Sequence, residues 1–236
     1  MAKNRHTLSE YRRLILLWLL LFSAAGGLSL HTGSGACSVA ENKSDSLVDS
    51  VLKRITEREA HLKTFTASFI QTQQNELLTT PLISKGILFY DRNGKMLMKI
   101  TDPEPFVVLI ANGLITMGNP ASKRFKQKAV PGRETFLKRY LGFERSITDL
   151  KTDYDIQMDG ECPETTCRLT FRPKKQSRGV RFQRIRVTVD TRLWLPTVIL
   201  LEEPNADFTR FDLFYHTVNE PLPPNTFNPD LLKGEK

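Results

Sequence analysis

The sequence between residues 62 and 106 contains strands that are apolar on both faces, and this feature limits the folds open to the chain. Side chains alternate between the faces of a strand, so a strand with one wet face shows alternating apolar and polar residues. Here Leu88 and Tyr90 point one way while Ile87 and Phe89 point the other, and residues 106–110 are all apolar. Such a sheet must be covered on both faces or must curve around something apolar.

Turn signals divide the chain into strands. Asn93-Gly94, Pro103 and Asn112-Gly113 are turn-forming residues between apolar runs. The pattern predicts strands near residues 64–69, 82–91, 95–101, 105–111, 114–118, 153–158, 167–172, 181–189, 193–202 and 207–217. About ten strands without alternating long helices indicate one large antiparallel sheet, and a sheet of that size must curl.

Helical spacing appears in three places. A first helix, capped by Ser44 or Ser46 and ending near Leu62, is predicted from an apolar stripe at 47, 48, 51, 52 and 55. Phe136, Leu137 and Tyr140 are spaced as in a short helix, and residues 147–150 predict one further turn. No repeat or low-complexity linker interrupts residues 37–236, which we interpret as one domain.

The N-terminus has the layout of a secretory signal peptide over residues 1–36. Basic residues precede an apolar run at 14–22, and small residues follow it. An uncleaved signal anchor is the alternative. Cys37 follows Gly35 and Ala36, so it is a candidate for lipidation, although Ser34 stands where the common lipoprotein signal has Leu. We expect export to the periplasm, with membrane anchoring through Cys37 as the variant of that expectation.

The two remaining cysteines lie close together in the sequence GECPETTC. Cys162 and Cys167 flank a predicted hairpin loop and can form a local disulfide if their Cβ atoms face each other. Two free thiols are the alternative. A zinc site is disfavoured because four ligands are usual and no further Cys or His is near.

The charge favours anionic partners without naming them. Removing residues 1–36, which hold four Lys or Arg and one Glu, lowers the formal charge from +8 to +5. One run is notably basic, with cations at 172, 174, 175, 178, 181, 184 and 186. It alternates with apolar residues and lacks base-stacking aromatics, so nucleic acid is not expected. A docking surface for lipid headgroups or an acidic protein, and a plain solvated face, both remain open.

Catalytic and metal-binding patterns are weak. Only His61 and His216 remain after signal removal, and no nucleophile, metal or phosphate-loop motif occurs. The acidic pairs Asp102/Glu104, Asp153/Asp155 and Glu202/Glu203 lie at turns or strand ends, where solvated surface charges are common. We therefore expect no enzyme, no cofactor and no metal. A hydrolase built around either histidine is the least favoured hypothesis.

Large apolar residues from several strands predict a cavity for lipid. The candidates are Phe69, Leu88, Phe89, Met96, Met98, Leu109, Ile115, Met117 and Phe211. Met is suited to irregular ligands. An ordinary core is the alternative. We expect one face of the sheet to carry the leading helix and the other to line the cavity, beneath a lid formed by Phe136, Leu137 and Tyr140.

Two stretches of the chain resemble the periplasmic outer-membrane lipoprotein carrier family, LolA. The matches in the first stretch are Phe65, Ala67, Phe69, Gln71, Gly86, Arg92, Gly94, Pro103 and Gly113. The second includes Leu195-Pro196, Phe208-Thr209 and a terminal element around Phe227. Leu97 and Met98 stand where the family usually has Arg and Trp. This puts the polar latch of the lid in doubt and makes the chain a divergent member.

The resemblance implies a mainly β fold: an unclosed antiparallel half-barrel of about ten to eleven strands, with an N-terminal helix and short lid helices. It also implies a periplasmic carrier that shields acyl chains between an inner-membrane ABC exporter and an outer-membrane receptor. We expect a monomer whose cargo is an acyl lipid or a lipoprotein. A carrier of glycolipid is one alternative, and an envelope sensor or assembly subunit that uses the fold for protein contacts is another.

Overall fold

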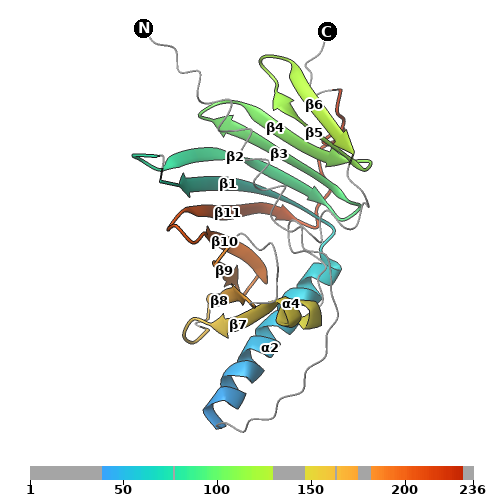
Figure 1. Cartoon of the computed structure of the whole chain (residues 1–236). Coiled ribbons are helices and arrows are strands. Elements are labelled where there is room, and N and C mark those ends of the chain that lie inside the picture. The colour runs from blue at the N-terminus through green and yellow to red at the C-terminus, as the bar shows by residue number, and fades with distance from the viewer. Residues whose placement is uncertain (1–38, 77, 130–146, 163, 175–181, 231–236) are drawn as a thin grey trace.

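The structure is a computed structural model, and it describes residues 39–76, 78–129, 147–162, 164–174 and 182–230. Eleven strands in these ranges form one antiparallel sheet (Figure 1). They are β1 (Thr64–Gln74), β2 (Leu82–Asp91), β3 (Lys95–Asp102), β4 (Phe106–Ala111), β5 (Leu114–Asn119), β6 (Arg124–Ala129), β7 (Tyr154–Met158), β8 (Thr166–Pro173), β9 (Arg184–Asp190), β10 (Leu195–Glu202) and β11 (Phe208–Val218). The predicted half-barrel of ten to eleven strands is confirmed.

The order of the strands makes two sets of neighbours along the chain. It runs β6-β5-β4-β3-β2-β1-β11-β10-β9-β8-β7, so every pair is consecutive in sequence except β1 with β11. Turn chemistry explains one of the tight connections. Between β4 and β5, Asn112 and Gly113 both have positive φ, at 54° and 73°, as a two-residue hairpin of the favoured twist requires. β6 and β7 are the two edges, and the sheet is not closed.

Two helices pack at one end of this sheet. Helix α2 (Val39–His61) contacts β7 and the short helix α4 (Ile147–Asp153), and Figure 1 shows both beside β7. The apolar stripe of α2 supplies Val48, Val51 and Leu52 to a buried cluster with Cys167 and Leu169 of β8. Four of the five stripe residues therefore face the sheet, while Leu47 is 49 % exposed. The predicted helical turn at 147–150 is also present.

The turn between β9 and β10 contacts α2 through Trp194. Asp190 Oδ1 accepts hydrogen bonds from the backbone N–H groups of Arg192 at 2.7 Å and Leu193 at 3.1 Å. The side-chain hydrogen bond from Arg192 and these N–H groups hold the pKa of Asp190 below its ordinary value, although burial opposes them. Trp194 ends the turn with a φ of 53°, and its ring lies 5.2 Å from the guanidinium of Arg54 on α2.

The structure corrects the predicted start of the first helix and adds one strand that was not predicted. Helix α2 begins at Val39, before both Ser44 and Ser46, so neither serine caps it. Strand β6, with the sequence RFKQKA, was not expected, because its exposed residues show no apolar alternation. Its hydrogen bonds to β5 and the packing of Phe125 determine its conformation, and neither is visible as a local pattern.

Candidate functional site

Cross-strand register assigns the apolar side chains to two faces. Residues paired across antiparallel strands share a face, and one such row is Met117, Val108, Met98, Leu88, Ala67 and Tyr215. A second row, Leu169, Val187, Ile199, Phe211, Gln71 and Ser84, connects the same face to β8, where α2 packs. We call this the helix face and the other one the far face.

The helix face carries one continuous apolar cluster from β5 to β10. Its buried members in the strands are Phe65, Ala67, Phe69, Leu88, Tyr90, Met96, Met98, Ile100, Phe106, Val108, Ile110, Ile115, Leu195, Leu201 and Phe211. Met117, Ile199 and Leu213 are half-buried beside them. Because α2 packs at the β7 end, this cluster extends well beyond the area that α2 covers. The geometry supplies a wide, methionine-containing apolar cluster, largely buried, rather than a set of reactive groups.

The packing of Phe69 explains why glycine occupies position 86. A Cβ at Gly86 would lie 2.1 Å from the carbonyl oxygen of Lys99 and 2.7 Å from the ring of Phe69. The missing side chain thus lets the Phe69 ring lie across β2. Phe69 is 1 % exposed, so this small residue makes room for one of the largest buried side chains of the helix face.

Aromatic rings pack together on the helix face near the start of β1 and the end of β2. Phe65 stacks on Tyr90 at 5.0 Å between ring centroids and meets Tyr215 edge to face at 5.3 Å. Tyr215 Oη donates a hydrogen bond to the carbonyl of Pro196 at 2.9 Å. Burial raises the pKa of this phenol, so it stays neutral and is compatible with an apolar ligand.

The helix face becomes polar at the end of β1, near Gln74, and at the adjoining start of β2. Gln71 lies opposite Ser84 across these strands, and Gln73 and Ser84 are both buried. The amide oxygen of Gln73 has no hydrogen-bond partner among the described residues. A buried acceptor of this kind costs about 1–3 kcal/mol, which marks this end of the face as suited to a polar group.

The structure brings together seven of the nine side chains that the sequence assigned to a cavity. Phe69, Leu88, Met96, Met98, Ile115, Met117 and Phe211 all belong to the helix-face cluster. Phe89 and Leu109 belong to a separate cluster on the far face. Phe89 follows the helix-face residue Leu88, and Leu109 precedes the helix-face residue Ile110. Because side chains alternate between the two faces of a strand, this spacing already assigned both residues to the far face. The expected division, with α2 on one face and the cavity on the other, is also corrected, because α2 lies on the helix face.

Of the other predicted site residues, only the two disulfide cysteines lie in the described part of the structure. Cys162 and Cys167 are joined by a disulfide with their Cα atoms 4.6 Å apart. The lid residues Phe136, Leu137 and Tyr140 and the lipidation candidate Cys37 lie outside the described residues. Their roles remain predictions.

The far face over β2–β5 carries an apolar cluster on which the C-terminal segment packs. Leu97, Val107, Leu109 and Ala111 are buried there with Phe227 packed against them. Leu97 is 0 % exposed. Lys95 Nζ lies 5.9 Å from the Phe227 ring. A pocket of about 560 Å³ lies beside this contact, lined by Thr64, Asp91, Lys95, Ala111, Asn112 and seven residues of the segment 221–228.

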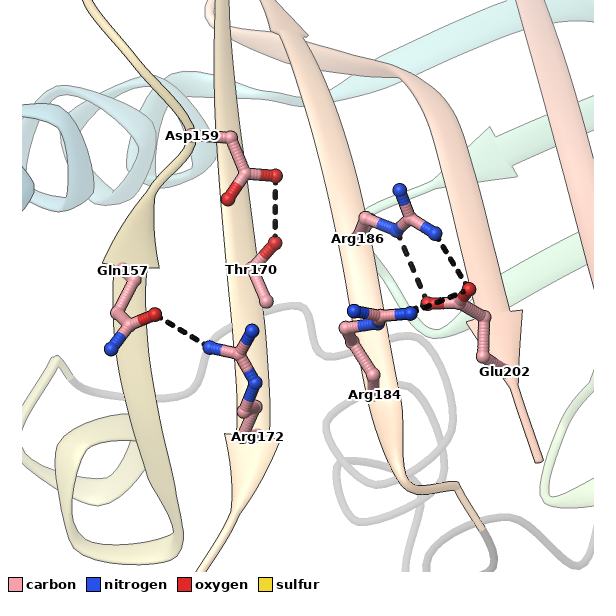
Figure 2. A network of polar contacts seen from close by, with 7 residues as sticks. All are labelled: Gln157, Asp159, Thr170, Arg172, Arg184, Arg186 and Glu202. Atoms are coloured by element: carbon pink, nitrogen blue, oxygen red, sulfur yellow. Dashed lines mark hydrogen bonds and ion pairs between the residues drawn. The ribbon is translucent and has the colours of Figure 1, made fainter. Parts of the chain in front are cut away.

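The far face over β7–β10 is polar instead (Figure 2). Glu202 Oε1 accepts hydrogen bonds from Arg186 Nη2 at 2.6 Å and Arg184 Nη2 at 3.1 Å. Partial burial of Glu202 favours a higher pKa, but the hydrogen bonds and charges of the two arginines outweigh it and hold the pKa below its ordinary value. Arg172 donates to Gln157, and Thr170 donates to Asp159.

This network accounts for much of the basic run seen in the sequence. Arg184 and Arg186 share Glu202, and Lys174 lies 3.7 Å from Asp155. Glu202 and Asp155 are therefore partners of cations rather than free surface charges. The other cations of the run, at 175, 178 and 181, lie outside the described residues.

The two histidines have local partners. His61 Nδ1 bonds the carbonyl of Glu57 in the last turn of α2 at 2.7 Å. His216 Nε2 bonds Ser68 Oγ on the exposed far face. Across the described ranges, the structure gives His216 no carboxylate that would orient it, so this pair lacks the third group of a hydrolytic triad. Those ranges also contain no cluster of His, Cys, Asp and Glu suited to a metal ion.

In the described part of the chain, neither helix combines the length and the apolar content needed to cross a membrane. A search of curated protein sequences found no match. Among solved structures, MucB has a TM-score of 0.51 at 14 % identity, over 78 % of this chain and 62 % of MucB. A conserved protein from Thermus thermophilus has a TM-score of 0.50 at 9 % identity, over 77 % of this chain and 92 % of that chain.

A LolA superfamily protein from Nitrosomonas europaea has a TM-score of 0.40 at 14 % identity, over 78 % of this chain and 98 % of that chain. Identities this low show a likeness in fold alone. The sequence match is more specific. The model of the family described as outer membrane lipoprotein carrier protein LolA matches residues 60–230, which is more than half of the chain. The chain therefore belongs to the LolA family.

Proposed function

We propose that this protein is a periplasmic carrier that holds the acyl chains of a lipid or lipoprotein on its helix face. The observation that carries the proposal is the continuous helix-face cluster, which extends beyond the area packed by α2. Membership of a family described by a lipoprotein carrier supports it. In this proposal residues 1–36 are the export signal and residues 37–236 act as one carrier domain.

Transfer needs no covalent step. Burying one methylene group gains about 0.8 kcal/mol, so the cargo moves to whichever surface offers the more favourable apolar contact. An inner-membrane exporter would supply the cargo and an outer-membrane receptor would take it. The flexible methionines at 96, 98 and 117 can adapt to acyl chains of different shape. Tyr215 donates its hydrogen bond to a backbone carbonyl, so its hydroxyl group does not need a ligand as a partner.

The direct test is native mass spectrometry of the protein purified from the periplasm, followed by lipid extraction. We expect bound acyl lipid. Met117→Glu places a carboxylate at a half-buried position of the helix face, and it should lower lipid occupancy at least about tenfold, the effect of losing about two methylene contacts. Met117 is a suitable site because it is not fully enclosed.

The matched control is Leu114→Glu on the same strand. Leu114 lies on the far face and is 39 % exposed, so this variant changes the charge equally and should keep its lipid. Circular dichroism should show that both variants fold. Unchanged occupancy in Met117→Glu, or protein that never carries lipid, would contradict the proposal. A protein partner retained without any lipid would favour the envelope sensor instead.

A further inference from the structure

Edge strand β6 places its cations on one face only. Lys126 lies opposite Met117, and Lys128 lies opposite Ile115, both on the helix face of β5. Arg124, two residues before Lys126, shares that face. Phe125 and Gln127 point the other way: Phe125 packs on the far-face cluster, and Gln127 Nε2 donates to Thr116 Oγ1 at 3.2 Å. Three positive charges therefore border the apolar helix face.

These cations have no carboxylate partner among the described residues. Arg124, Lys126 and Lys128 are all exposed, and the ion pairs of the described chain involve other residues. Arg184 and Arg186, in contrast, share a carboxylate. Lysines on an edge strand also discourage pairing between sheets, but that role is served from either face. It does not explain why only the helix face receives the charges.

The spacing of the strands fits a lipid whose headgroup lies at β6. One leaflet of a bilayer accounts for half of a hydrocarbon core of about 30 Å, so an acyl chain spans about 15 Å. Neighbouring strands are about 4.8 Å apart, and three such steps lead from Lys126 through Met117 and Val108 to Met98. Apolar side chains thus line this path along its whole length; Met117 is half-buried, and Val108 and Met98 are buried.

We propose that Arg124, Lys126 and Lys128 bind the phosphate of an anionic phospholipid whose acyl chains lie on the helix face. The inference rests on the proposed carrier function and names its cargo class. The cations supply charge at the edge of the sheet, while the row from Met117 to Met98 supplies the apolar contact. Neither part alone selects a lipid that combines a phosphate with acyl chains.

A competition experiment tests this proposal. The full mature protein is incubated with phosphatidylcholine vesicles that contain equal fractions of phosphatidylglycerol and of diacylglycerol with the same acyl chains. Native mass spectrometry then measures the ratio of the two bound lipids. We expect phosphatidylglycerol to predominate and Lys126→Glu/Lys128→Glu to lower the ratio at least about tenfold, since each surface cation contributes about 1 kcal/mol toward an anionic lipid. Higher salt should reduce the preference of the wild type.

The control is Lys85→Glu/Lys99→Glu, which makes the same charge change at two exposed far-face lysines, and it should retain the wild-type ratio. An equal wild-type preference for both lipids, or an equal loss in the control, would overturn the β6 assignment while leaving the carrier function standing. Competition by glycerol phosphate would indicate a free-anion site and would also overturn it. Failure to bind any acyl lipid would overturn the carrier function together with this inference.

Discussion

The two halves of the far face are stabilised in different ways, one by apolar packing and the other by polar pairs. Over β2–β5 the face carries an apolar cluster, and the C-terminal segment packs on this cluster through Phe227. Over β7–β10 the face is polar, and its side chains satisfy one another through Glu202 and the two arginines it holds. The two halves thus stabilise their central side chains by different means, while Ile83, Ile87, Leu114 and Phe214 of the far face stay exposed. The larger apolar cluster lies on the helix face.

The largest expected effect comes from placing a charge in the covered half. Leu97→Asp would bury a carboxylate at a position that is 0 % exposed and should lower the free energy of unfolding by more than about 4 kcal/mol. Leu200→Asp is the matched change in the polar half, because Leu200 lies between Arg186 and Arg210 in register, and it should cost less than about 2 kcal/mol. Urea unfolding measures both, and equal losses would refute the distinction.

Removing the cover should have an intermediate effect. Phe227→Ala deletes the ring that packs on Leu97 and Leu109 and should destabilise the protein by about 2 kcal/mol, since the ring is only partly buried. The exposed apolar surface should also bind a hydrophobic dye. Phe214→Ala serves as the control, because Phe214 is 52 % exposed, and it should cost under about 1 kcal/mol without added dye binding. Identical behaviour of the two variants would contradict the covering role.

The smallest effect is expected in the polar half. Glu202→Gln removes the charge that Arg184 and Arg186 share and should cost about 1–2 kcal/mol at neutral pH. The folded-state pKa of Glu202 lies below its ordinary value of 4.5, so its contribution is present above pH 4.5 and is lost as pH falls through the folded-state pKa.

The stability difference between the wild type and Glu202→Gln should therefore shrink in acid. Thermal unfolding across this pH range checks the trend, with the exposed Glu161→Gln as control. A difference that stays constant in acid would show that the carboxylate charge is not what stabilises the pair.

Much of the sheet could be predicted from the sequence because its strands are bounded by strong turns. Asn112-Gly113 defines a hairpin, and the two-faced apolar pattern of β3 and β4 reflects real burial on both faces. The family likeness added the unclosed half-barrel, which local patterns do not determine. Strand β6 was missed because hydrogen bonding to β5, and not its own composition, keeps it extended.

The candidate site was predicted in part. Met96 and Met98 of β3 lie in one cluster with Phe69 of β1, as the sequence grouped them, because all three face the same side of the sheet. Phe89 was misplaced, although its position next to Leu88 already implied the other face. The covering of the far face by Phe227 depends on contacts between residues more than a hundred positions apart, and no local pattern reports such contacts.

The pairing of β1 with β11 has a consequence for how the chain folds. Nine of the ten strand pairings join strands that are consecutive in sequence, but the two sets of strands join only through the pair of β1 and β11. Closing so long a loop carries an entropic cost before any contact repays it. We therefore expect the joining of β1 to β11 to limit the folding rate, with each set of hairpins forming first and the complete apolar surface appearing only in the last step.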